Sequence, residues 1–260
     1  MMNNKEYKQM VFENWYIEKF DNEQDTNALE YITEHMIRKF ISIFGRDIML
    51  KEDCYIYLDK QASCPMLVLN HEVLKIRLTS EKTSYWSQII YQLSHEMCHY
   101  AMRQGSDDKE TISWFEETMC EAMSLYFLDY FAKTWTSCKL SKNDKGYSKS
   151  IKSYLDNILG KYKEKSILEK CANFLQLENI EKTCTDSRDF RAEDRDKIYY
   201  LFKKHSKKIY MITDYKKYKV NKIGIDFELW LKNKRNDRFI KGLNGLVPNM
   251  KFNQEGKLIV

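Results

Sequence analysis

The chain has 260 residues, of which 43% are hydrophobic and 31% are charged, and its formal net charge is +5. This composition supports a buried core and excludes disorder over a long span, and no apolar run reaches the length of about 18 residues that a membrane-spanning helix needs. With 8 Gly and 2 Pro among stretches rich in Lys, Leu and Glu, an all-β protein is excluded, and we expect a mostly helical α+β fold.

The N-terminal residues and the cysteines indicate a reducing compartment. Residues 1–8 lead into a segment of mixed charge and lack the apolar core of a secretory signal. The seven cysteines are odd in number and form no Cys-x-x-Cys pair, which favours free thiols. We therefore expect a soluble, cytoplasmic protein without a membrane partner.

One amphipathic helix and three short strands are predicted before residue 80. Apolar residues recur at helical spacing from about residue 26 to 44, and Gly45 ends this helix. The predicted strands are residues 54–58, 66–69 and 73–79. In the third of them polar and apolar residues alternate, so it is either an edge strand with one wet face or an ordinary interior strand.

The pentapeptide His95-Glu96-Met97-Cys98-His99 lies in the middle of the next predicted helix, from about residue 84 to 103. Residues four apart on an α-helix lie about 6 Å apart on one face, so His95 and His99 can bind one Zn²⁺. Glu96 lies about 100° around the helix, where it can reach a water on the metal as general base. The alternative is a helix with two buried histidines.

The following helix, which begins near Ser113, offers a third ligand. Glu117 and Glu121 are one turn apart and share a face. We assign Glu117 to the metal and expect Glu121 to accept a hydrogen bond from one histidine ligand, which would fix the orientation of its ring. Glu116 lies on another face, where we expect it to cap the helix with Ser113 or to face solvent.

These two helices resemble the active site of the gluzincin zinc metallopeptidases, which include thermolysin and the M1 aminopeptidases. Members have HExxH on one helix and a glutamate ligand about 18 to 20 residues later, often with another acid four residues beyond it. Seventeen residues separate His99 from Glu117 here, one fewer than that range, and Trp-Phe-Glu-Glu-Thr-Met-Cys-Glu is similar to the aminopeptidase stretch Trp-x-x-Glu-x-x-x-Glu. The Gly-x-Met-Glu-Asn motif of the aminopeptidases is absent, so their specificity is not implied.

By position, the resemblance implies His95, His99 and Glu117 as ligands of one zinc ion per chain, Glu96 as general base and general acid, and Glu121 as a partner of a ligand. It also implies a peptide or protein substrate that pairs with a strand beside the zinc helix, for which residues 73–79 are the candidate. A tyrosine or histidine that stabilises the oxyanion is implied too, but the sequence does not assign it. The function predicted is therefore that of a zinc-dependent peptidase.

Charge divides the chain into two parts. Residues 1–138 carry 14 Lys and Arg against 22 Asp and Glu, a net charge of −8, whereas residues 139–260 carry 29 against 16, a net charge of +13. We predict a catalytic domain over 1–138 and a basic helical subdomain over 139–260. The predicted helices of the subdomain are residues 148–162, 166–175, 192–211 and 226–234, followed by an extended tail from 242 to 260.

Two interpretations of the basic part remain open. It is either a solubilising surface on a subdomain that closes one side of the cleft, or a binding surface for an acidic partner, a nucleic acid or an acidic protein. The alternative function is accordingly a nucleic-acid-associated or protein-binding module whose zinc site is structural or inactive. Glu96 distinguishes the two functions, because a structural zinc site does not need a base beside its first ligand.

Overall fold

The computed structural model describes residues 5–70, 73–161, 166–185, 188–247, 251–252 and 258–259. They form helices and a mixed sheet, which confirms the α+β class. The chain has two compact units, of which the first is Met1–Gln104 with Ser124–Asp156 and the second is Gly105–Met123 with Asn157–Val260. The boundary near residue 139 inferred from charge stays a prediction.

The first unit is built on a five-stranded mixed sheet. Its strands are β1 (Tyr7–Gln9), β2 (Trp15–Glu18), β3 (Cys54–Leu58), β4 (Met66–Asn70) and β5 (Val73–Leu78). They lie in the order β1-β2-β3-β5-β4, in which the β2-β3 and β3-β5 pairs are parallel and the two outer pairs are antiparallel. The three predicted strands are present, whereas β1 and β2 were not predicted, because three or four residues are too few to establish an alternating pattern.

Strand β5 lies inside the sheet, between β3 and β4, so the edge position considered for residues 73–79 is wrong. Its residues alternate between buried and half-buried. This pattern reflects the two faces of the sheet and does not reveal which strands are hydrogen-bonded on either side. Strand β4 forms this edge of the sheet.

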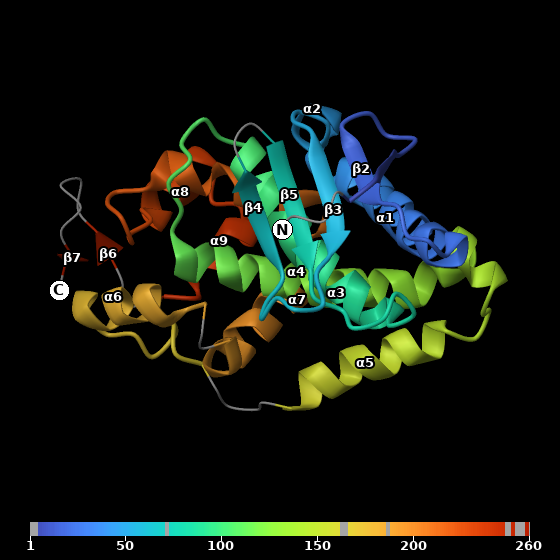
Figure 1. The fold of residues 1–260 in the computed structure, drawn as a ribbon. Coiled ribbons are helices and arrows are strands. Elements are labelled where there is room, and N and C mark those ends of the chain that lie inside the picture. Colours follow the sequence, from blue (N-terminus) through green and yellow to red (C-terminus); the bar gives the residue numbers. More distant parts are fainter. Residues whose placement is uncertain are drawn as a thin grey trace. The chain divides into compact units, whose positions relative to one another are not determined.

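Helices α1 (Glu23–Phe44) and α3 (Trp86–Gln104) pack against strands of the first unit. The other helical elements of this unit are α2 (Arg46–Met49), the second half of α4 (Ser113–Thr134), the short 3₁₀ segments η1 (Trp135–Ser137) and η2 (Lys139–Lys142), and most of α5 (Ser148–Lys161). Helix α3 packs against β4, β5 and α1, and Figure 1 shows it passing behind the strands. The sheet therefore supports the helix that carries the HExxH sequence.

Local signals explain the ends of α1, whose helical periodicity is evident in the sequence. The side chain of Asn22 accepts a hydrogen bond of 2.9 Å from the backbone N–H of Gln24, which caps the first turn. At the other end Gly45 has a φ of +89°, a conformation that side chains rarely adopt.

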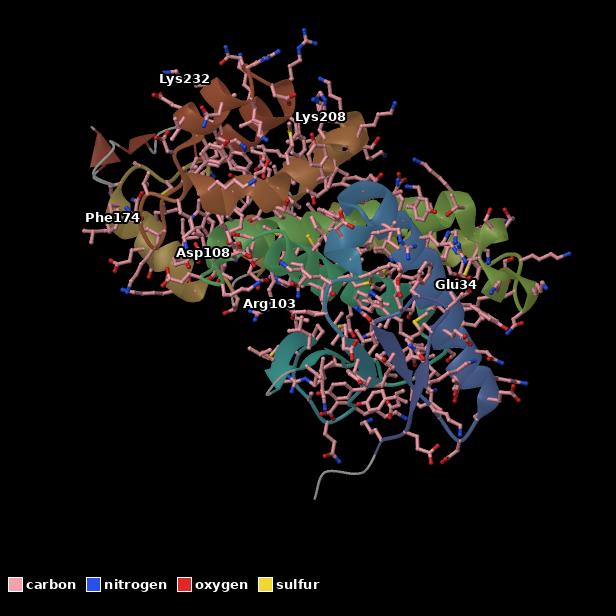
Figure 2. All side chains as sticks on the ribbon, turned by 90° about the horizontal axis from the view of Figure 1, so that it is seen from above. Glu34, Arg103, Asp108, Phe174, Lys208 and Lys232 are labelled. Atoms are coloured by element: carbon pink, nitrogen blue, oxygen red, sulfur yellow. The ribbon has the colours of Figure 1, made fainter. Side chains whose placement is uncertain are left out.

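An ion-pair cluster joins α1 to η2. The Glu34 carboxylate (Figure 2) accepts hydrogen bonds from Arg38 at 2.7 Å and from Lys139 at 2.6 Å. Although burial by itself raises the pKa of the Glu34 carboxyl, these two cations lower it below its ordinary value. The cluster thus favours the ionised carboxylate in the folded protein.

The second unit is helical, and its elements only partly follow the predicted ones. It contains the first half of α4, α6 (Phe174–Thr183), η3 (Arg188–Arg191), α7 (Ala192–Lys204), η4 (Ser206–Tyr218), α8 (Phe227–Asn233), α9 (Arg238–Asn244) and the two-residue strands β6 (Lys251–Phe252) and β7 (Leu258–Ile259). Helices α5 and α8 match their predicted ranges, although residue 162 lies outside the described residues. No described helix combines the length and apolar character needed to cross a bilayer.

The helix predicted over residues 166–175 is wrong, because that segment is held by a distant carboxylate. Asp194 accepts hydrogen bonds from the Ser166 hydroxyl and from the backbone N–H groups of Ile167 and Leu168, the last two at 3.1 and 3.2 Å. Helix α6 instead begins after Asn173, whose side chain accepts from the backbone N–H of Gln176 at 3.0 Å.

Two further boundaries were also wrong. The single helix predicted over 192–211 is divided at His205 into α7 and the 3₁₀ segment η4. On one α-helix the lysine pairs 203/207 and 204/208 would place like charges one turn apart, which disfavours the helix. The extended tail predicted from residue 242 begins inside α9, and residues 248–250, 253–257 and 260 of that tail lie outside the described residues.

Candidate metal centre

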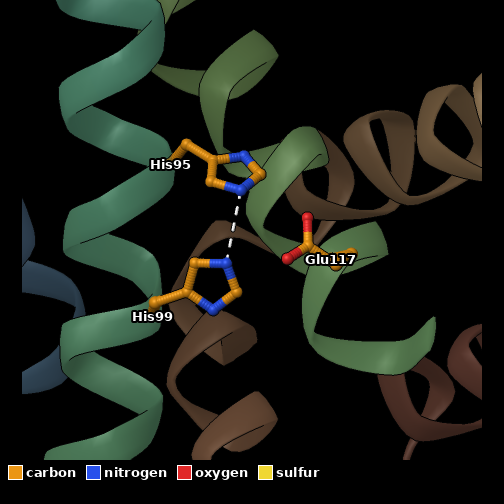
Figure 3. Close-up of side chains that lie close together, drawn as sticks. All are labelled: His95, His99 and Glu117. Atoms are coloured by element: carbon orange, nitrogen blue, oxygen red, sulfur yellow. Dashed lines mark hydrogen bonds between the residues drawn. The ribbon is translucent and has the colours of Figure 1, made fainter. Parts of the chain in front are cut away.

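Helix α3 presents His95 and His99 on one face. Apolar residues at helical spacing are buried around them, including Ile90, Leu93 and Met97. The Nε2 atoms of the two histidines lie 3.3 Å apart, and His95 is 2% exposed while His99 is half-buried (Figure 3). The close approach follows from the four-residue spacing that the sequence shows.

Helix α4 places Glu117 opposite these rings. In the first unit the Ser124 hydroxyl donates a hydrogen bond of 2.9 Å to the carbonyl of Tyr91, which ties the second half of α4 to α3. One ligand atom from each of His95, His99 and Glu117 lies within 4.8 Å of the others (Figure 3).

Glu96 directly follows His95 in the chain, and the residue is 3% exposed. Among the described residues no hydrogen bond or ion pair to its side chain is present. Its carboxylate is therefore not taken up by another protein group.

Glu121 pairs with an arginine that the sequence did not suggest. The Nη2 atom of Arg191, in η3, donates to Glu121 Oε1 at 3.1 Å and to the carbonyl of Cys184 at 2.6 Å. Both charged side chains are wholly buried. The hydrogen bond expected between Glu121 and a histidine stays a prediction.

Glu116 is not a capping or solvent-facing residue, as was expected. It is 4% exposed, its carboxylate accepts a hydrogen bond from the hydroxyl of Tyr215, and the Lys216 ammonium lies 3.7 Å away. Burial and the Glu116 charge raise the pKa of the Tyr215 phenol far above its ordinary value, so Tyr215 stays protonated and donates. Glu116 therefore belongs to the core of the second unit.

The N-terminus of α4 is capped by Glu181 of α6. Its two carboxylate oxygens accept from the backbone N–H groups of Ser113 and Trp114, each at 2.9 Å. A carboxylate at a helix N-terminus satisfies amides that have no partner within the helix and interacts favourably with the helix dipole. Ser113 and Glu181 are 68 residues apart in the sequence, so no local pattern indicates the hydrogen bond between them.

The cysteines near the site do not contribute to the ligand group. Cys98 and Cys120, which flank the ligands in sequence, are wholly buried and stand outside it. Burial also raises the pKa of the Cys184 thiol to about 11, although Arg191 opposes the shift. This thiol is therefore protonated at neutral pH and is neither a nucleophile nor a ready metal ligand.

Comparisons with protein-family models, with curated proteins and with solved structures find no match to this chain. Its function is consequently inferred from the residues themselves.

Proposed function

We propose that the chain is a zinc-dependent peptidase whose metal ligands are His95, His99 and Glu117. The observation that carries the proposal is the grouping of these three donors within 4.8 Å, with the buried residue Glu96 next to the first of them in the chain. Two imidazoles and one carboxylate form the ligand set of zinc peptidases that keep a fourth position for water.

The histidine geometry fits zinc. Tetrahedral coordination with Zn–N bonds of about 2.0–2.1 Å separates two donor nitrogens by about 3.4 Å, and the Nε2 atoms are 3.3 Å apart. The same separation also allows a hydrogen bond between the two rings, which Figure 3 draws. The ligand atom of Glu117 lies within 4.8 Å of both histidine donors.

Zinc held by His95, His99 and Glu117 would supply Lewis acidity and make a water near it more acidic. The proton transfer is assigned to a residue of the chain. The Glu96 carboxylate takes a proton from the attacking water and delivers it to the amine nitrogen that leaves. The resemblance to gluzincins supports the same roles for these positions.

The substrate we propose is a peptide in extended conformation, bound along β4. This strand has no neighbour on its outer side among the described residues, and its Met66 and Leu69 side chains are 44% and 56% exposed. Main-chain pairing with an open strand is a general mode of peptide recognition. Strand β4 replaces residues 73–79 as the candidate, because β5 has both of its edges occupied.

We also propose that the protein acts in the reducing cytoplasm. All seven cysteines are free thiols, and six of them are buried. Disulfides form and persist in oxidising compartments, so a chain with this many unpaired thiols suits the cytosol.

The decisive experiment compares the zinc-loaded native protein with Glu96→Gln on a mixed peptide library, followed by mass spectrometry. We expect the variant to keep about one zinc per chain and to lose turnover by about 10²–10⁴-fold, because only the proton transfer is removed. Glu30→Gln, a change of the same kind in α1, should leave hydrolysis intact. Equal cleavage by the native protein and Glu96→Gln would contradict the mechanism and favour a structural zinc site.

A further inference from the structure

The second unit carries a concentration of positive charge that peptide hydrolysis does not require. Residues 203–241, from the end of α7 through α9, contain 13 Lys and Arg against 4 Asp and Glu, a net charge of +9. The elements of this segment contact one another in space, and Figure 2 shows Lys208 and Lys232 on one side of them.

Most of the acidic groups in this segment are already engaged. Asp214 pairs with Lys217 and Lys234, and Asp237 pairs with Lys208 at 2.9 Å. Asp226 caps α8 through the backbone N–H of Leu229. Seven exposed cations of this segment have no ion pair among the described residues. We call six of them, all but Lys222, the basic region: Lys204, Lys207, Lys232, Arg235, Arg238 and Lys241.

Two exposed tyrosines accompany these cations. Tyr200 is 57% exposed and lies one helical turn before Lys204 on α7. Tyr210 is 42% exposed and lies within electrostatic reach of Lys208 and Lys234. Exposed aromatic rings beside lysines are what a single-stranded nucleic acid uses, because its phosphates bind the cations and its unpaired bases stack on the rings.

We propose that the basic region, with Tyr200 and Tyr210, binds single-stranded nucleic acid. A duplex keeps its bases stacked internally and gives the tyrosines no partner. An anionic membrane favours a helix with a broad apolar face. Among the described residues of α8 and α9, one large apolar side chain, Leu229, is exposed, and a single side chain does not make such a face. An acidic protein would use the lysines and leave the aromatic rings unexplained.

The test measures fluorescence anisotropy of labelled oligothymidine and oligouridine of about 20 nucleotides at about 50 and 200 mM salt. Lys204→Glu/Lys207→Glu should weaken binding at least about tenfold and lower the salt slope by about 0.7 for each phosphate that is no longer neutralised. The matched control is Lys142→Glu/Lys145→Glu, which changes the net charge equally at exposed positions of the first unit and should keep the native affinity.

The tyrosines are tested separately from charge. Tyr200→Ala/Tyr210→Ala should weaken binding about tenfold at unchanged salt slope, whereas Tyr200→Phe/Tyr210→Phe should restore it, since stacking needs the ring and not the hydroxyl. Absence of binding by the native protein at the lower salt would overturn the proposal. So would equal losses in both charge-reversed proteins, or tighter binding to phosphatidylserine vesicles than to either oligonucleotide. Because Glu96→Gln should bind normally, the outcome is independent of the peptidase proposal.

Discussion

The guanidinium of Arg191 lies 3.1 Å from the carboxylate of Glu121, and both side chains are completely buried. Glu121 is one helical turn after Glu117, so this ion pair fixes α4 next to a proposed metal ligand. A buried charge that loses its partner is strongly destabilising, because no water compensates it.

Arg191→Met should therefore lower the free energy of unfolding by about 3 kcal/mol, measured by urea denaturation. Lys152→Met is the matched control, since it breaks an ion pair whose two side chains are each 54% exposed, and it should cost less than about 1 kcal/mol. A loss in Arg191→Met no larger than that of the control would show that Glu121 is neutralised by another group.

The ligand assignment predicts a specific pattern of zinc loss. His99→Ala and Glu117→Ala should each weaken zinc binding by about a hundredfold or more, since removing a ligand costs more than removing its outer partner. Glu116→Gln removes the adjacent carboxylate charge in the core of the second unit and should keep zinc, although it lowers stability. Metal content by mass spectrometry after dialysis against a weak chelator checks this, and equal zinc retention in Glu116→Gln and Glu117→Ala would refute the assignment.

The sequence revealed what depends on local spacing. The periodicity of α1, α3 and α4 is continuous along the chain, so the helices and the shared face of His95 and His99 could be predicted. Glu181 and Arg191 could not, because their hydrogen bonds with α4 span 68 and 70 residues and depend on how the helices of the second unit pack. For the same reason Glu116 was misplaced, since its partner Tyr215 is 99 residues away.

The Glu34 cluster predicts a dependence of stability on pH. The pKa of the Glu34 carboxyl is lower in the folded protein than its ordinary value of 4.5. The contribution of Glu34 to the free energy of unfolding is therefore complete above pH 4.5 and disappears as the pH falls through the folded pKa. Glu34→Gln should lower the free energy of unfolding by about 1 kcal/mol at pH 7, a modest figure because Arg38 and Lys139 are mostly exposed. At a pH below the folded pKa the native protein and the variant should become alike.

Urea denaturation at the two pH values measures this difference. Glu13→Gln serves as control, because Glu13 and its partner Arg46 are 71% and 61% exposed, and it should change stability little at either pH. A difference between Glu34→Gln and the native protein that grows on acidification would contradict the lowered pKa.

The capping of α4 by Glu181 predicts an effect on the helix that carries Glu117. Glu181→Ala removes both acceptors of the Ser113 and Trp114 amides, so the first turn of α4 should fray at a cost of about 1–2 kcal/mol. Because Glu117 follows in the next turn, zinc binding should weaken too, but less than in Glu117→Ala. Hydrogen exchange of peptides covering residues 105–123 reports the fraying directly.

Glu178 provides the matched control for this capping interaction. It lies about one turn before Glu181 on α6 and pairs only with Lys182 among the described residues, at 3.2 Å and with its side chain 40% exposed. Glu178→Ala should leave the exchange of α4 and the zinc affinity as they are in the native protein. Equal hydrogen exchange of Glu181→Ala and Glu178→Ala over residues 105–123 would contradict the capping role of Glu181. The first turn of α4 would then be held by its tertiary packing, chiefly by Trp114, because the indole N–H of Trp114 donates to the carbonyl of Ile223 at 2.9 Å.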